Sequence, residues 1–255
     1  MENNFYRTKD KRYYTLDGIR GIAILNMILY HMVWDLVHLF GMKWTWYHSP
    51  GAFIWQQGIC WTFIFLSGFC HALGRKQVKR GWIVFLVGAL LSVFTSIVMP
   101  ENRVVFGVLT LIGSCMLLMI PMEPILKRGN PIIGFAISMI FFILTRNINQ
   151  GYLGFGDWNV LSLPDYWYCN LVTTYFGMPI PGFYSTDYFS LFPWVFLYVA
   201  GIYCYQFCNR RRLLWHLKAS KVEVIEWLGQ HSLLIYIAHQ PILFVVLHTV
   251  FTILL

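Results

Sequence analysis

The sequence has few charged residues. Only 12% of its 255 residues are Asp, Glu, Lys or Arg, whereas a soluble globular domain usually has about a quarter. Hydrophobic residues make up 58% of the chain and aromatic residues 18%. Because a spanning helix needs roughly 20 mostly apolar residues, the chain has room for about seven spans and for no sizeable soluble domain. The composition predicts an integral membrane protein.

Cysteine pairs with metal-binding or redox spacing are also missing. The six cysteines include no CxxC pair. Most of them lie in or beside predicted spans, so they suggest no disulfide framework. Zinc binding and thiol redox chemistry are therefore not expected, and no metal cofactor is predicted. The sequence has no internal repeat and no low-complexity segment, so we expect one domain over residues 1–255.

Basic residues outnumber acidic residues by 19 to 11, which gives a net charge of +8. Fifteen of the 19 fall in four clusters between hydrophobic runs, so the excess does not indicate a nucleic-acid partner. An alternating topology places the four clusters on one side of the membrane, which is the positive-inside pattern. They are Arg7, Lys9, Lys11, Arg12; Arg75, Lys76, Lys79, Arg80; Lys127, Arg128; and Arg210, Arg211, Arg212, Lys218, Lys221. The N-terminus is predicted to be cytoplasmic and the C-terminus extracytoplasmic.

Hydropathy and loop signals predict an all-α bundle of about seven membrane-spanning helices. The predicted spans are residues 14–39, 51–74, 80–99, 104–125, 131–146, 188–208 and 229–254. Pro100, Pro121, Pro124 and Pro131 are expected at helix ends, because proline cannot continue a helix. A long outward loop, residues 147–187, separates spans five and six. Its Trp and Tyr residues suit either the lipid interface or an acceptor site.

The first predicted span carries ionisable residues along one face. On a helix, Asp17, Arg20, His31, Asp35 and His38 fall within a sector of about 60°. Ionisable residues inside a membrane usually face the bundle interior or a water-filled cavity and mark a functional site. Asp17 and Arg20, at positions i and i+3, are expected to pair near the cytoplasmic surface. A structural network that holds the first helix to its neighbours is the alternative.

His31 is expected toward the outer half of the span. It follows Arg20 by eleven residues, or about 16 Å along a helix. Asp35 lies one turn beyond it. A carboxylate in that position can orient the ring and raise its basicity, as a general base requires.

The last predicted span carries a second polar face. Ser232, Tyr236 and His239 share it, either as part of a site or as polar contacts between helices. His71 lies near the basic loop after span two, where an interfacial role is the first expectation. His48 lies in the short loop after span one, on the same predicted side as His31.

Five segments resemble, in order, bacterial relatives of the heparan-α-glucosaminide N-acetyltransferase catalytic domain. The segments are LDGIRGIAILNMILYH, FIFLSGFCHAL, VFGVLTLIGSCMLL, DYFSLFPWVFLYVAGIY and LGQHSLLIYIAHQPIL. The first and last are fairly specific together, whereas the middle three are weak alone. This family belongs with the transmembrane acyltransferases, which include the acyltransferase-3 proteins of bacterial surface-glycan O-acetylation.

The resemblance implies transfer of an acetyl or similar acyl group from cytoplasmic acyl-CoA to a hydroxyl or amine of an extracytoplasmic acceptor, in a bacterial plasma membrane. Arg20 and His31 match an Arg–x10–His spacing of the acyltransferase-3 relatives, which implies Arg20 for CoA and His31 for transfer. In the lysosomal glucosaminide enzyme the histidine lies in the loop after span one, where His48 is the nearest match. The choice between His31 and His48 stays open. Many relatives have histidine where this chain has Thr110.

These arguments give two sets of predicted site residues. The predicted catalytic residues are His31, Asp35 and His48. The predicted residues for binding acetyl-CoA, the co-substrate, are Arg20, Asp17, Arg75, Lys76, His71, Ser232, Tyr236 and His239. The expected partners are the lipid bilayer, acyl-CoA and a sugar or amine acceptor, with no nucleic acid. The oligomeric state, a homodimer included, is left open.

Two other functions compete with acyl transfer. A proton-coupled small-molecule transporter would use the Asp, Arg and His side chains of the first span as a relay. The sequence shows neither the internal repeat nor the pair of broken helices that such transporters usually have. Haem ligation by paired histidines is the third hypothesis.

Overall fold

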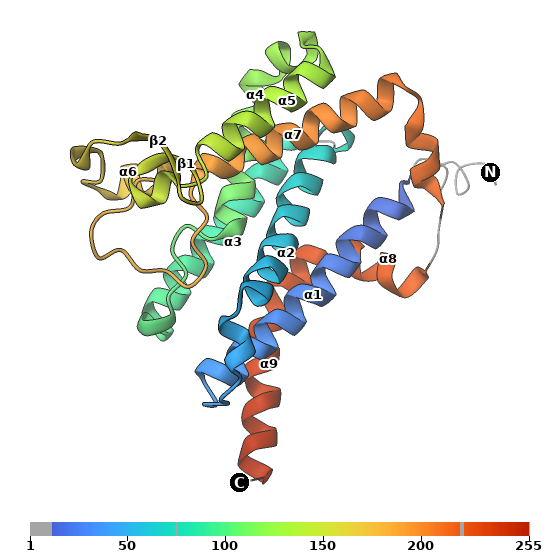
Figure 1. Ribbon diagram of the computed structural model, residues 1–255. Coiled ribbons are helices and arrows are strands. Elements are labelled where there is room, and N and C mark those ends of the chain that lie inside the picture. Colours follow the sequence, from blue (N-terminus) through green and yellow to red (C-terminus); the bar gives the residue numbers. More distant parts are fainter. Residues whose placement is uncertain (1–11, 75, 220–221, 255) are drawn as a thin grey trace, which may run out of the picture. The chain divides into compact units, whose positions relative to one another are not determined.

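The structure is a computed structural model that describes residues 12–74, 76–219 and 222–254 (Figure 1). Seven of its helices are long and apolar enough to cross a membrane, which confirms the predicted number of spans. They are α1 (Tyr14–His38), α2 (Pro50–Phe69), α3 (Gln77–Val98), α4 (Val108–Arg128), α5 (Pro131–Leu144), α7 (Leu191–Arg210) and α9 (Ser232–Leu254). Helix α5 reaches spanning length with the turns that follow it to Gln150. The orientation of the termini stays a prediction.

The chain divides into two compact units. Unit 1 consists of Met1–Phe63 and Arg211–Leu255, and unit 2 consists of Ile64–Arg210. Helix α2 belongs to unit 1 as far as Phe63 and to unit 2 from Ile64 on.

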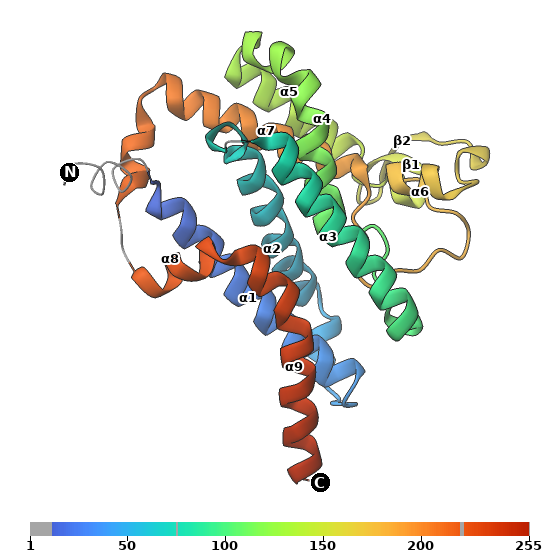
Figure 2. The same ribbon diagram turned by 180° about the vertical axis from the view of Figure 1, so that it is seen from behind.

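Unit 1 is built around α1. This helix packs against α9 and against α8 (Glu223–Gln230), a short helix that precedes α9. Figures 1 and 2 both show α8 lying along α1, and α9 continuing past the end of α1. Ile24, Met27 and Ile59 form its apolar core. On another face of α1, Trp55 Nε1 donates a hydrogen bond of 3.0 Å to Asn26 Oδ1.

Two glycines set how closely α1 and α8 approach. A Cβ atom at Gly229 would lie 1.8 Å from the carbonyl oxygen of Asp17, and one at Gly21 would lie 1.9 Å from that of Ile225. No real Cβ atom tolerates such a contact, so any larger residue would push the backbones apart. Small residues allow the same close packing between helices in membranes. The crossing brings α8 against the charged first turns of α1.

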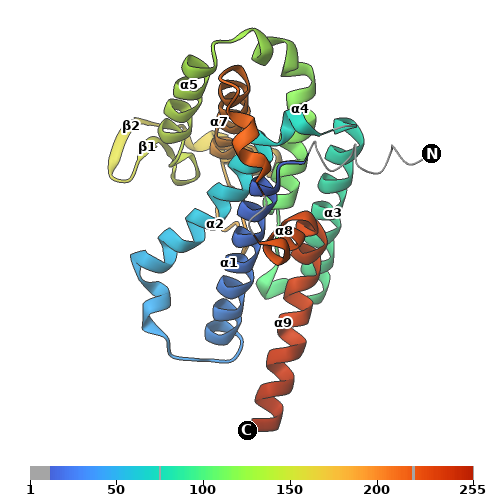
Figure 3. The same cartoon turned by 90° about the vertical axis from the view of Figure 1, so that its right-hand side faces the viewer.

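Unit 2 consists of two helix pairs with a loop region. Helix α3 packs against α4, and α5 packs against α7 (Figure 3). The α3–α4 pair is antiparallel, because Gly88 faces Thr110 and Gly81 faces Leu117. Between α5 and α7 the chain forms the antiparallel strands β1 (Tyr152–Phe155) and β2 (Trp158–Ser162), followed by α6 (Leu171–Phe176). The 3-10 turns of both units are Thr45–His48, His71–Leu73, Pro100–Asn102, Ile148–Gln150, Asp165–Trp167 and Leu213–Lys218.

Several predicted boundaries were wrong. Helix α4 begins at Val108 and continues through Pro121 and Pro124, which were expected at its end. A proline removes one donor from a spanning helix, and neighbouring groups can satisfy the freed carbonyl. The last predicted span, 229–254, is interrupted at His231, so that α8 and α9 are separate helices. Helix α2 ends at Phe69 rather than at residue 74.

Candidate active site

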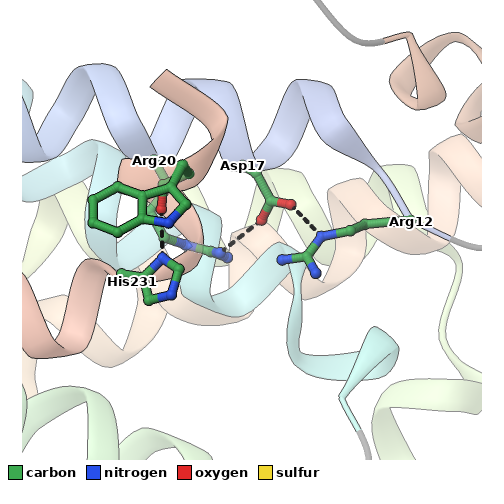
Figure 4. A network of polar contacts seen from close by, with 5 residues as sticks. Arg12, Asp17, Arg20 and His231 are labelled. Carbon is green, nitrogen blue, oxygen red and sulfur yellow. Dashed lines mark hydrogen bonds and ion pairs between the residues drawn. The ribbon is translucent and has the colours of Figure 1, made fainter. Parts of the chain in front are cut away.

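The first turns of α1 carry an arginine–aspartate cluster. Arg12 Nε donates to Asp17 Oδ2 at 2.7 Å, and Arg20 Nη1 donates to Asp17 Oδ1 at 3.3 Å (Figure 4). The Arg20 contact confirms the predicted i, i+3 pair. Asp17 is only 7% exposed, and charge-assisted hydrogen bonds offset the cost of burying its carboxylate.

Residues near the break between α8 and α9 complete this end of unit 1. Figure 4 draws His231 in the same polar network as Asp17 and Arg20. His231 Nδ1 lies 2.9 Å from the carbonyl oxygen of Trp227, and the two rings pack 4.4 Å apart. Glu226 is buried on α8. The sequence analysis gave these residues no role, because it began the last span at residue 229 and assigned no helix to residues 223–228.

Two histidines meet farther along α1. The rings of His31 on α1 and His239 on α9 have centroids 4.9 Å apart and planes at 56°. His31 is half-buried, and His239 is 7% exposed. The Tyr236 ring lies 5.6 Å from that of His239. His31 and His239, one from each predicted polar face, therefore meet between α1 and α9.

Asp35 lies one turn beyond His31 and is fully buried, with 0% exposure. Its Oδ1 accepts a hydrogen bond of 2.8 Å from Gln240 Nε2. Its Oδ2 has no hydrogen-bond partner among the described residues. No hydrogen bond between Asp35 and His31 is found in the described part of the chain, so the expected orienting contact is not formed. The Asp35 carboxyl group is held instead by Gln240, which the sequence analysis missed. The sequence did contain a sign of it, because Gln240 is a second polar residue directly after His239 in an apolar segment.

His48 lies in the 3-10 turn after α1 and is exposed. Its ring lies 6.2 Å from that of His38 and 5.6 Å from that of Tyr47. Tyr47 is anchored, since its hydroxyl donates a 2.9 Å hydrogen bond to the Tyr30 hydroxyl. Burial and this hydrogen bond raise the pKa of Tyr47 well above its ordinary value of 10.0. The turn is thus tied to α1, with His48 at its surface.

Unit 2 contains a separate cavity of about 480 Å³ near the loop between α2 and α3. Its lining includes His71, three lysines and the apolar residues Met119, Ile120 and Ile202. The lysines are Lys76, Lys79 and Lys127, of which Lys127 is paired with Glu123 at 2.6 Å. The predicted binding residue Arg75 lies outside the described residues.

His71 connects polar groups at the wall of this cavity through two hydrogen bonds. Its Nδ1 shares a hydrogen bond of 2.9 Å with the buried Tyr198 hydroxyl, and its carbonyl accepts from the Gln77 amide. Burial lowers the pKa of His71 below its ordinary value of 6.5, so the neutral ring is favoured. The buried Oε1 atoms of Gln77 and Gln206 have no hydrogen-bond partner within the described residues. Both glutamines line the cavity.

Together these features define a class of protein. Ionisable side chains buried on apolar spanning helices, and held by specific partners, are typical of polytopic membrane proteins with a functional site inside the bundle. The family model described as heparan-alpha-glucosaminide N-acetyltransferase, catalytic, matches residues 12–241. The chain belongs to this family and is a multi-pass membrane protein of the acetyltransferase class. Comparison with curated proteins and with solved structures gave no match.

The Asp35–Gln240 hydrogen bond is expected to contribute to stability. Gln240→Leu leaves a fully buried carboxyl group without its donor, which should cost about 1–3 kcal/mol. The double variant Asp35→Leu/Gln240→Leu removes both polar groups and should recover most of that loss, because an apolar pair replaces a buried polar pair at little cost. Thermal unfolding of the wild type, both single variants and the double variant in detergent measures the coupling. Additive losses in the double variant would show that the two residues are not coupled.

Proposed function

We propose that the protein transfers an acetyl group from cytoplasmic acetyl-CoA to a hydroxyl or amine of an acceptor across a bacterial plasma membrane. The acceptor is a sugar or a cell-surface glycan. The observation that carries this proposal is the family match over residues 12–241, which includes the arginine–aspartate cluster, the two histidines and the cavity. The family description names a glucosaminide, so an amino sugar is the first acceptor to test.

We assign His31 to the transfer step. It is half-buried on a spanning helix and lies against a second histidine. An imidazole in this setting can act as a general base or carry the acyl group as a nucleophile. His48 is the alternative. It lies beside His38 but is exposed, whereas His31 is half-buried between helices.

We assign the phosphates of CoA to the cavity of unit 2. Three lysines and one glutamate line it, which leaves an excess of two positive charges. Lysine ammonium groups bind phosphate through charge-assisted hydrogen bonds. The free amide oxygens of Gln77 and Gln206 can accept hydrogen bonds from an adenine amine or a ribose hydroxyl. Arg20 is a weaker candidate for the phosphates, since it already pairs with Asp17.

The donor assignment predicts a charge-dependent affinity. The double variant Lys76→Gln/Lys79→Gln should bind acetyl-CoA at least about tenfold more weakly, because a hydrogen bond to a charged group is worth about 1.5–3 kcal/mol. Binding of acetyl-CoA and of dephospho-CoA to purified protein measures the effect. Lys43→Gln, a lysine outside the cavity, is the matched control. Unchanged affinity of the double variant would remove the cavity from consideration as the donor site.

The transfer assignment predicts that the two histidines differ. His31→Ala should lower acetyl transfer from acetyl-CoA to glucosamine by at least about 100-fold, the usual contribution of a side chain that takes part in proton transfer, and should leave acetyl-CoA binding unchanged. His48→Ala should keep most of the activity. The release of free CoA and the formation of N-acetylglucosamine are measured together in detergent.

Full activity of His31→Ala would overturn its assignment, and a steep loss in His48→Ala would move the transfer step to the loop.

The transporter alternative makes a different prediction. If the protein takes up a solute in response to a pH gradient and does not bind acetyl-CoA, the proposed function is wrong and the protein is a transporter.

A further inference from the structure

His239 has one ring nitrogen in a hydrogen bond and one without a partner. Its Nδ1 lies 2.6 Å from the carbonyl oxygen of Tyr236, one turn earlier in α9. Its Nε2 is buried and has no hydrogen-bond partner among the described residues. The side chain as a whole is 7% exposed.

The contact with Tyr236 determines where the ring carries its hydrogen. A carbonyl oxygen can only accept, so Nδ1 must be the protonated nitrogen. In a neutral imidazole the other nitrogen then carries the lone pair. Nε2 of His239 is therefore a basic atom in a buried position, fixed in that state by the backbone of its own helix.

The neighbours of His239 hold the ring in place. The next residue in the chain, Gln240, donates to the fully buried Asp35 on α1. The His239 ring lies 4.9 Å from the ring of His31, which is on α1 as Asp35 is. A buried polar atom without a partner costs free energy, and a hydrogen-bond donor from a bound substrate would remove that cost.

We infer that His239 is a catalytic base of the acetyl transfer, with Nε2 as the atom that accepts the proton of the acceptor. The inference rests on the proposed function and gives the role of general base to His239. His31, whose ring lies 4.9 Å from that of His239, then takes part in the transfer step as the neighbour of the base and not as the base itself. The sequence alone placed His239 with the CoA-binding residues, and its tautomer now gives it a different role. Asp35 and Gln240 are positioning residues for it.

The reaction balances with His239 in this role. The acceptor oxygen or nitrogen forms a bond to the acetyl carbonyl carbon while its proton moves to Nε2. The bond between that carbon and the CoA sulfur breaks, and the electron pair leaves with sulfur. The proton then passes from Nε2 to the CoA thiolate. The products are the acetylated acceptor and CoA, and the ring returns to its starting tautomer.

Three substitutions separate the base from its structural contacts. His239→Asn keeps an amide that can donate to the Tyr236 carbonyl, as Nδ1 does, but has no atom at Nε2. His239→Gln places an amide near the Nε2 position without a basic lone pair. His239→Ala removes both functions. The matched control is His248→Asn, the same substitution at an exposed histidine on the same helix, whose ring stacks on Phe244.

The experiment measures acetyl transfer to glucosamine, acetyl-CoA binding and thermal stability for each variant. We expect His239→Asn and His239→Gln to bind acetyl-CoA as the wild type does and to lose at least about 100-fold in kcat. Since Asn preserves the hydrogen bond to Tyr236, its stability should exceed that of His239→Ala while its activity stays equally low. His248→Asn should remain active.

If His239→Ala is inactive and His239→Asn is as active as the wild type, the inference is overturned, because the hydrogen bond to Tyr236 is then the whole role of the residue. Wild-type activity in both the Asn and the Gln variant would also overturn it. A wild type that binds no acetyl-CoA and releases no CoA would overturn the proposed function itself, and the inference with it. That result is distinguishable because it appears in every protein, the control included.

Discussion

The hydrogen bond between Gln240 and Asp35 is the interaction on which the histidine site of unit 1 depends. A carboxyl group with 0% exposure on an apolar spanning helix is costly unless a donor reaches it. The donor comes from α9, 205 positions away in the sequence. Since Gln240 follows His239 directly, the bond that satisfies Asp35 also fixes α9 in the register that places His239 against His31. One hydrogen bond thereby satisfies a buried carboxyl group and places two imidazoles side by side.

The other polar groups of the protein follow the same constraint. At the start of α1, two arginines donate to one buried carboxylate, and the glycine crossing brings the backbone of α8 against this part of α1. In unit 2, His71 is held by Tyr198 and by Gln77, and the lysines stand at the wall of a cavity. The structure thus offers two kinds of site. One is a basic cavity suited to phosphate, and the other is a pair of adjacent imidazoles, one half-buried and one buried, suited to proton transfer.

The sequence was sufficient for features that depend on local pattern. Hydropathy located all seven spans, and the i, i+3 spacing predicted the Asp17–Arg20 pair. The helical period placed His31 and Asp35 on a face of α1 that meets α9.

Features that depend on distant parts of the chain could not be read in this way. The partner of Asp35 is such a case, because no local pattern distinguishes His31, one turn away, from Gln240 on α9. The close packing of α8 on α1 depends on Gly229 meeting Asp17, a tertiary contact that hydropathy does not detect. The β1–β2 hairpin is local, but it depends on a register shift at Gly154 and a turn at Gly156, both with positive φ, which hydropathy does not detect. The tautomer of His239 also depends on a nearby residue, but it follows from the side-chain position that brings Nδ1 to the Tyr236 carbonyl oxygen, which the sequence pattern does not determine.

The central claim is that a membrane-embedded site moves an acetyl group from acetyl-CoA to an acceptor on the other side. It is tested most directly in sealed proteoliposomes, with radiolabelled acetyl-CoA outside and glucosamine enclosed. The account predicts that labelled N-acetylglucosamine accumulates inside while free CoA appears outside. Label that stays in acetyl-CoA, or product that forms only when glucosamine is added outside, would contradict it.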